Sequence, residues 1–444
     1  MQIQIPEKVN RIIRTLAAAG HEAYAVGGCV RDALLGREPA DWDITTSASP
    51  AEVKALFHRT IDTGIQHGTV TVMLEQEGFE VTTYRVDGAY EDCRHPEEVR
   101  FTKSLLEDLK RRDFTINAMA YNETAGLVDV FDGAGDLKKG LIRCVGRAEE
   151  RFTEDALRIM RAVRFSAQLG FCLEPATEEA AGRLCGNLSR VSAERVQAEL
   201  VKLLVSPHPE KLRDAWRIGI TGIIMPEFDR CMACAQNNPH HIYSVGEHTI
   251  RALEQVEADK VLRLTMLFHD FGKPEMKTTG GDGVDHFKRH PEAGAELAEQ
   301  ILRRLKFDNE TVRRVTKLVL CHDRHPELTP AGVRRAVNRI GEELFPLYLK
   351  VQRADVLAQN PAMQEPKLQA LAEVGRLYEQ ILEEKNCFTL KQLAVGGRDL
   401  MEAGFPAGPL LGEILAYLLE LVMEAPERNE KEWLLREALR KYRE

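Results

Sequence analysis

The 444-residue sequence lacks a run of eighteen apolar residues, so no segment is predicted to span a membrane. Its first residues lack the basic and then apolar order of a signal peptide. The nine cysteines are odd in number and mostly scattered, which argues against a disulfide framework. This pattern favours reduced thiols and a cytoplasmic location. No internal repeat or low-complexity tract stands out.

Positive charge is also in deficit. The formal net charge is −9, whereas phosphate binding generally requires a basic face. Local basic clusters nevertheless occur, at residues 110–112 and among the arginines between 143 and 164. Composition therefore neither indicates nor excludes RNA as a partner.

The length and the hydrophobic pattern predict several domains, because 444 residues are too many for one core. Runs rich in β-branched residues at 70–74, 79–84 and 127–131 predict short strands. From about residue 148 onward, apolar residues recur at helical spacing and strand signals nearly vanish. The predicted fold class is α+β, with a small α/β head followed by an elongated all-helical part.

Proline-bearing breaks near residues 205, 225 and 360 divide the helical part. We predict four parts in chain order: a catalytic head at 1–140, a helical neck at 141–205, a helical body at 206–375 and a helical tail at 376–444.

The most informative segment covers residues 26–36 (VGGCVRDALLG) and is followed by Asp41 and Asp43. The glycine pair can bring backbone amides against phosphates, and a helix that begins near Arg31 adds donors and a guanidinium group. On a β-strand alternate side chains share one face, so Asp41 and Asp43 point the same way. Two such carboxylates suit magnesium that carries substrate phosphates. The combination resembles the active-site plan of nucleotidyltransferases of the DNA polymerase beta superfamily.

A second motif lies at residues 110–120 (KRRDFTINAMA). Arg112 can hold a phosphate, and Asp113 can accept hydrogen bonds from sugar hydroxyls. Asn117 follows four residues later, along the same helical face. The alternative is a charged helix start with Asp113 as its cap.

A third motif lies at residues 154–165 (EDALRIMRAVRF). Because residues three apart are neighbours on a helix, Asp155, Arg158, Arg161 and Arg164 are predicted to form a charged stripe. The alternative is a solvated amphipathic helix with a single ion pair.

The three motifs in this order, with residues 129–137 between the second and the third, resemble the class II tRNA nucleotidyltransferases, the CCA-adding enzymes. Residues 192–204 are similar to the family's head-to-neck motif, and residues 388–444 resemble the C-terminal part of its Gram-positive members. The resemblance implies addition of C, C and A to the 3′ end of tRNA, without a nucleic-acid template, from CTP and ATP with release of diphosphate. It implies neither a membrane nor an obligate protein partner.

The resemblance also implies residue roles. Asp41 and Asp43 would hold two magnesium ions, and Glu80 would be a third carboxylate. Asp155 would accept from the exocyclic amino group of cytosine or adenine, while Arg158 would donate to the adjacent ring nitrogen. Uracil and guanine present the opposite polarity at both points. The implied nucleotide-binding residues are Gly28, Arg31, Arg112, Asp113, Asp155, Arg158, Arg161 and Arg164.

The segment at residues 87–96 resembles the family's flexible loop, which is needed to switch from cytidine to adenosine addition. Its presence favours full CCA addition over CC addition only. An enzyme that adds only A stays an open alternative. A poly(A) polymerase is disfavoured because that sister enzyme usually carries a long basic C-terminal extension.

A second group of potential ligands lies in the helical region and consists of His248, His269, Asp270, His290, His322 and Asp355. Imidazole with carboxylate suits manganese, iron or magnesium-type sites better than thiolate-rich zinc sites. The ligand order His, His-Asp, Asp resembles that of the HD phosphohydrolase superfamily, and His290 and His322 would extend the site to two metals. That resemblance implies attack of a metal-bound water on a phosphate ester, although such domains also persist as scaffolds.

Cys231 and Cys234, followed by His240 and His241, have zinc-like spacing. No second thiolate pair matches them, so we interpret this segment as a helix end followed by a loop.

Overall fold

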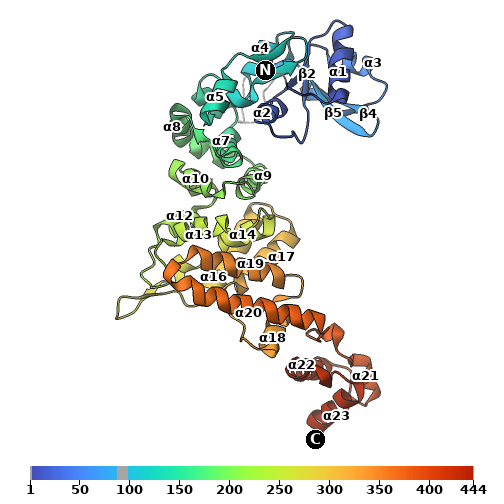
Figure 1. Cartoon of the computed structure of the whole chain (residues 1–444), viewed down its shortest axis with the longest axis vertical. Helices are drawn as coiled ribbons and strands as arrows, with labels where there is room; N and C mark the ends of the chain where they lie inside the picture. The colour runs from blue at the N-terminus through green and yellow to red at the C-terminus, as the bar shows by residue number, and fades with distance from the viewer. Residues whose placement is uncertain (1–2, 88–98, 444) are drawn as a thin grey trace. The chain divides into compact units, whose positions relative to one another are not determined.

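The computed structural model describes residues 3–87 and 99–443. The chain divides into two compact units, Met1–Pro226 and Glu227–Glu444 (Figure 1). This boundary coincides with the break predicted near residue 225, while the finer division into four parts stays a prediction. None of the described helices is both long enough and apolar enough to cross a membrane.

The first unit contains a seven-stranded sheet with the strand order β3-β4-β5-β2-β1-β8-β9. Strands β2 and β5 are parallel, with Ile44 opposite Val81, and the other pairs are antiparallel. The strands are β1 (Ala23–Val26), β2 (Ile44–Thr46), β3 (Thr60–Gly64), β4 (Thr69–Leu74), β5 (Glu77–Thr83), β8 (Met119–Asn122) and β9 (Gly126–Asp129). The three strands predicted from the sequence are therefore confirmed as β4, β5 and β9.

Strand β9 ends at Asp129, two residues before its predicted end, because the Asp129 carboxylate redirects the chain. Its two oxygens accept hydrogen bonds from the backbone N–H groups of Gly133 and Ala134, at 2.7 and 2.8 Å. These bonds satisfy donors at the start of the next helix.

Helices accompany the sheet and then continue without it (Figure 1). The helices of the sheet region are α1 (Glu7–Ala18), α2 (Gly28–Leu34), α3 (Pro50–Leu56), α4 (Leu105–Lys110) and α5 (Gly133–Lys139). The following helices are α6 (Ala148–Glu154), α7 (Leu157–Leu169), α8 (Pro175–Leu184), α9 (Ala193–Leu204), α10 (Leu212–Ile218) and α11 (Ile220–Ile224). Helix α7 packs against α9 and buries most of its side chains, including Arg164. This pairing positions the third sequence motif.

Among its described residues, the second unit is helical apart from one two-stranded ribbon of β12 (Thr278–Thr279) and β13 (Asp285–His286). Helices α13, α14, α16, α17 and α19 pack on one another, and α22 and α23 form a separate apolar cluster near the C-terminus. The helices are α12 (Pro226–Ala233), α13 (Val245–Glu254), α14 (Lys260–Phe268), α15 (Lys273–Met276), α16 (His290–Arg304), α17 (Asn309–Cys321), α18 (Pro330–Ile340), α19 (Phe345–Ala358), α20 (Gln364–Glu383), α21 (Gly397–Glu402), α22 (Pro409–Glu424) and α23 (Lys431–Tyr442). The predicted sequence of an α/β part followed by a helical part is confirmed.

Candidate functional site

Asp41 and Asp43 lie in the extended segment immediately before β2, not on the strand itself as predicted. The Asp43 carbonyl accepts a hydrogen bond from the Val26 N–H at 3.0 Å, but the regular ladder with β1 begins only at Ile44. An extended segment keeps the alternation of side chains.

Glu80 is brought to the same place by strand register. Since Ile44 pairs in parallel with Val81, the preceding residues Asp43 and Glu80 are neighbours on adjacent segments of the backbone. Asp41, Asp43 and Glu80 line one cavity of about 660 Å³. Within the described part of the chain, none of these three carboxylates forms an ion pair with a basic side chain.

Desolvation raises the pKa of Asp43, the positive charge of Arg112 opposes this shift, and the negative charge of Asp41 adds to it. Carboxylates that lie together without basic partners repel one another unless a cation is bound between them. Their oxygen atoms are the hard ligands that magnesium prefers. The residues present at this cavity therefore fit a divalent cation.

The glycine turn places a guanidinium group beside this cavity. Gly27 has φ +84° and precedes α2, which begins at Gly28, three residues before its predicted start. A Cβ atom on Gly27 would lie 3.1 Å from Nη1 of Arg112. Arg112 Nε is buried and has no hydrogen-bond partner among the described residues. A buried donor without a partner is costly.

The Arg31 guanidinium group lies close to Gly28, the residue that follows the same turn. Its guanidinium group donates two hydrogen bonds to the Asp32 carboxylate, at 2.8 and 2.9 Å. It donates a third to the Asn117 side chain at 2.8 Å. Its predicted contact with the triphosphate, like that of Gly28, stays a prediction.

Asp113 and Asn117 do not share a helix, contrary to the prediction. Helix α4 ends at Lys110, and Asn117 closes a short 3-10 turn. The two side chains are nevertheless joined by a hydrogen bond of 3.2 Å from Asn117 Nδ2 to Asp113 Oδ1. Arg161 donates to the other Asp113 oxygen from Nε and Nη2, at 2.9 and 2.5 Å. Although burial alone would raise it, the Arg161 guanidinium holds the pKa of Asp113 down to about 2.

The predicted stripe of Asp155, Arg158, Arg161 and Arg164 is wrong in one respect. The three arginines lie on α7, but Asp155 lies in the break between α6 and α7. Asp155 is outside the helix because its carboxylate accepts from the Leu157 N–H at 3.1 Å, within the first turn of α7.

Asp155 and Arg158 each have a partner in this structure, and the two partners differ. Arg195 of α9 donates to Asp155 Oδ2 at 2.8 Å. Arg158 donates to Glu154 Oε2 at 2.6 Å. The two predicted base-recognising groups are thus held separately, each by an ion pair.

Glu199 and Arg195, both on α9, are functional-site residues that the sequence analysis did not assign. Glu199 accepts from Arg164 Nε at 2.7 Å in a buried pair, and Arg164 also lies over the Phe165 ring at 3.6 Å. Their spacing of four residues on one helix was the available signal.

Residues 88–96 of the predicted flexible loop lie outside the described residues.

The six predicted ligands of the helical region converge in the second unit. His248 Nε2 lies 3.2 Å from His269 Nε2 and 2.9 Å from Asp355 Oδ1. His290 Nε2 lies 3.2 Å from His322 Nε2. Asp270 lies between the two pairs, with Oδ2 3.3 Å from His269 and Oδ1 3.5 Å from His290. One carboxylate therefore belongs to two groups of potential metal ligands.

Hydrogen bonds fix the orientation of all four imidazole rings. Each Nδ1 faces a backbone carbonyl: Ala358 for His248, Met266 for His269, Phe287 for His290 and Val319 for His322. A carbonyl only accepts, so each Nδ1 carries a proton, and each Nε2, which faces the cluster, is the nitrogen that can bind a metal when the ring is neutral. In each pair the two Nε2 atoms lie 3.2 Å apart and close to the Asp270 carboxylate, so these residues fit divalent metals.

Asp270 is the charged centre of this cluster. Burial would raise its pKa, but the neighbouring side chains of His269 and Lys273 hold the pKa of Asp270 well below its ordinary value. Lys273 Nζ lies 2.7 Å from Asp270 Oδ2. The cluster opens to a cavity of about 340 Å³ that is lined by Lys273, Lys288 and Lys367 and also by Asp285, Asp323 and Asp355. The cavity thus carries charged groups of both signs beside the cluster.

Cys231 and Cys234 are buried, and neither belongs to a group of potential metal ligands among the described residues. Cys231 lies within α12, and Cys234 directly follows that helix. The structure thus agrees with the interpretation of this segment as a helix end followed by a loop.

Comparison with known proteins adds three family matches. The "Poly A polymerase head domain" matches residues 23–143, and the "Probable RNA and SrmB-binding site of polymerase A" matches residues 170–232. A domain described as tRNA nucleotidyltransferase domain 2 matches residues 290–438. Residues 233–289, which carry three of the six clustered ligands, lie outside these matches.

Three relatives match nearly the whole chain. The CCA-adding enzyme of Lactiplantibacillus plantarum is 37% identical over 429 residues, which cover 96% of this chain and 93% of that protein. The CCA-adding enzyme of Bacillus velezensis is 37% identical over 435 residues, with 96% and 97% coverage. The crystal structure of the Bacillus stearothermophilus CCA-adding enzyme in complex with CTP has a TM-score of 0.74 and 31% identity, covering 99% of this chain and 98% of that one.

Proposed function

Because the chain belongs to the family of CCA-adding enzymes, we propose that it adds C, C and A to the 3′ end of tRNA from CTP and ATP, releasing diphosphate. The observation that carries this proposal is 37% identity to a CCA-adding enzyme across 96% of the chain. The cysteine pattern favours a cytoplasmic site of action. Addition of only A or only CC, and poly(A) synthesis, are less favoured.

In this mechanism Asp41 and Asp43, with Glu80 beside them, would hold two magnesium ions. Bound there, the ions would supply activation of the tRNA 3′-hydroxyl and charge neutralisation for the leaving diphosphate. Arg112 contributes its unpartnered Nε to the nucleotide, and Asp113 can accept from the ribose hydroxyls while Arg161 keeps it ionised.

Base selection falls to the neck. Asp155 accepts from the amino group that cytosine and adenine share, and Arg158 donates to the neighbouring ring nitrogen. Arg195 and Glu154 orient these two groups through the ion pairs described above. Uracil and guanine would leave both groups facing like polarity, which is costly in a desolvated pocket.

Single-nucleotide product analysis tests this function. Three tRNA transcripts ending before CCA, after C and after CC are each offered CTP, ATP or both. We expect two C additions followed by one A and then arrest. Addition of A only, and only to the transcript ending in CC, would make the protein an A-adding specialist. Long A tails would instead indicate poly(A) polymerase.

We propose a second function for the helical unit, at the cluster of His248, His269, Asp270, His290, His322 and Asp355. The convergence of four imidazole rings on Asp270 favours a site for two divalent metal ions, with Asp270 shared between them. When bound, such a pair supplies an activated water that attacks a phosphate ester. Lys273 would neutralise charge beside Asp270 and face the anionic ligand.

Metal titration tests this second site without reference to activity. In the background of Asp43→Ala, which removes the head site, we expect two Mn²⁺ ions per chain by calorimetry. Asp270→Ala should lose both ions because this carboxylate reaches both groups, whereas His322→Ala should lose one. His286→Ala, at a histidine that lines the cavity outside the cluster, is the matched control. Retention of two ions by Asp270→Ala would refute the shared site.

A further inference from the structure

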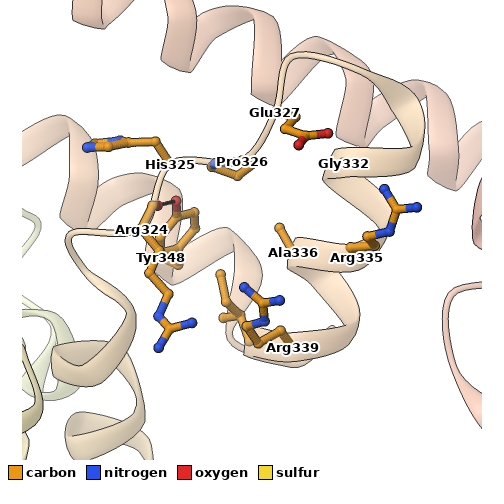
Figure 2. A pocket seen from close by; sticks show the side chains of 10 residues that line it. Arg324, His325, Pro326, Glu327, Gly332, Arg335, Ala336, Arg339 and Tyr348 are labelled. Atoms are coloured by element: carbon orange, nitrogen blue, oxygen red, sulfur yellow. Dashed lines mark hydrogen bonds between the residues drawn. The ribbon is translucent and has the colours of Figure 1, made fainter. Parts of the chain in front are cut away.

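A second cavity of the helical unit is lined by arginines (Figure 2). It has a volume of about 220 Å³ and lies between the loop after α17, helix α18 and Tyr348 of α19. Figure 2 shows the side chains of Arg324, Arg335 and Arg339 around it. Nothing in the proposed functions uses these three residues.

The three arginines differ in their partners. Arg335 is ion-paired with Glu420 and Glu424 of α22. Within the described part of the chain, neither Arg324 nor Arg339 has a carboxylate oxygen within 4.0 Å. The cavity therefore holds two guanidinium groups that its own structure does not neutralise.

One carboxylate, that of Glu327, also lines this cavity. In the view of Figure 2 it lies at the upper edge, whereas the guanidinium groups of Arg324 and Arg339 lie at the lower edge. The lower part of the cavity is therefore the part with uncompensated positive charge. Guanidinium groups match phosphate oxygens in geometry as well as charge.

The loop that carries Arg324 is hydrogen-bonded to α19, the helix that also carries the cluster residue Asp355. Gln352 of α19 donates hydrogen bonds to the carbonyls of His322 and Arg324, at 2.6 and 3.0 Å. Tyr348, also on α19, donates to the Arg324 carbonyl. Asp355, a ligand in the cluster, lies on this helix one turn after Gln352. The position of Arg324 relative to the cluster is thus set by the fold.

The two cavities share a wall. His325 lines both the arginine cavity and the cavity of the cluster. It follows the cluster residue His322 by three positions, and three residues span at most about 11 Å even when extended. The two cavities therefore adjoin at His325, and a ligand that extends past this residue would contact both.

We propose that Arg324 and Arg339 bind the second phosphate of a ligand whose first phosphate lies at the histidine cluster. The ligand class is the phosphorylated end of an RNA strand, in which one nucleoside separates two phosphates. The 340 Å³ cavity, which is lined by Lys273, Lys288 and Lys367 as well as by three aspartates, receives the first phosphate and the nucleoside. This inference rests on the second proposed function and names the substrate class of that site.

Binding of two small probes to the full-length protein tests the proposal. Uridine 3′,5′-bisphosphate carries both phosphates, and UMP carries one; uridine is chosen because the head is proposed to reject that base. With Mn²⁺ present, and with the probe checked by chromatography to be intact, calorimetry should give the bisphosphate at least about tenfold tighter binding. A tenfold difference corresponds to about 1.4 kcal/mol, the size of one hydrogen bond to a charged group.

Arg339→Ala and Arg324→Ala should each remove most of this advantage and leave UMP binding unchanged. Arg436→Ala, at an exposed arginine of α23 away from both cavities, is the matched control for loss of one charge. Equal affinities of the wild type for the two probes, or equal weakening of both probes in the variants, would overturn the arginine subsite. Absence of Mn²⁺ binding in the same experiments would refute the metal site alone, because the difference between the two probes would still decide the role of the arginines.

Discussion

Replacing Asp43 by alanine should abolish all nucleotide addition to tRNA, with a loss of at least about a thousandfold in the rate of CTP incorporation. Metal ions contribute several kcal/mol to reactions of this type, and each 1.4 kcal/mol is tenfold in rate. Asp43 follows Asp41 by two residues and neighbours Glu80 through the strand register. Its removal leaves the cation site without one of its proposed ligands.

The effect should be specific to a carboxylate of the cation site. Glu77 lines the same cavity but forms an ion pair with Lys8 at 3.0 Å, and its side chain is mostly exposed. Glu77→Ala removes the same charge from the same cavity and should retain activity within about threefold, since exposed ion pairs contribute little. Measurable single-turnover incorporation of CTP by Asp43→Ala would contradict the two-metal assignment. A comparable loss in Glu77→Ala would mean that the cavity needs negative charge in general.

Much of the fold could be predicted from the sequence because the signals are local. The strands at 70–74 and 79–84 alternate in burial, and the helical spacing after residue 148 follows from side-chain periodicity. Helix α2 begins three residues before its predicted start because Gly27 turns the chain with a positive φ and the helix follows at once. A pattern of apolar residues carries no information about that angle.

The candidate site could be predicted in its residue types but not in its pairing. Asp155 was assigned to a helix because its spacing to Arg158 fits one, yet its carboxylate caps the start of α7 and breaks the helix there. The partners Arg195 and Glu199 come from α9, some forty residues away along the chain. Such pairs depend on how α7 and α9 pack, which the sequence pattern does not specify. The same holds for the carbonyl groups that orient the four histidines.

Arg158→Ala should lose selectivity between bases while retaining the triphosphate. One bidentate contact to a base contributes about 1–3 kcal/mol of discrimination, so the ratio of kcat/KM for CTP over UTP should fall about 10- to 100-fold. The KM for CTP should change less, because the phosphates are assigned to residues of the head. Arg158→Lys keeps the charge without the planar fork and should restore only part of the selectivity.

The control for this variant comes from the ion pairs around Glu154. Arg151 and Arg158 both pair with Glu154, so Arg151→Ala disturbs the same carboxylate without removing the proposed base contact. If Arg158 reads the base, only its own variants should admit UTP. If Arg158 merely holds α6 against α7, both alanine variants should lose activity with CTP and UTP in parallel and leave the ratio unchanged. An unchanged preference against UTP in Arg158→Ala would therefore remove this residue from the base-selecting pair and leave discrimination to Asp155 or to the shape of the pocket.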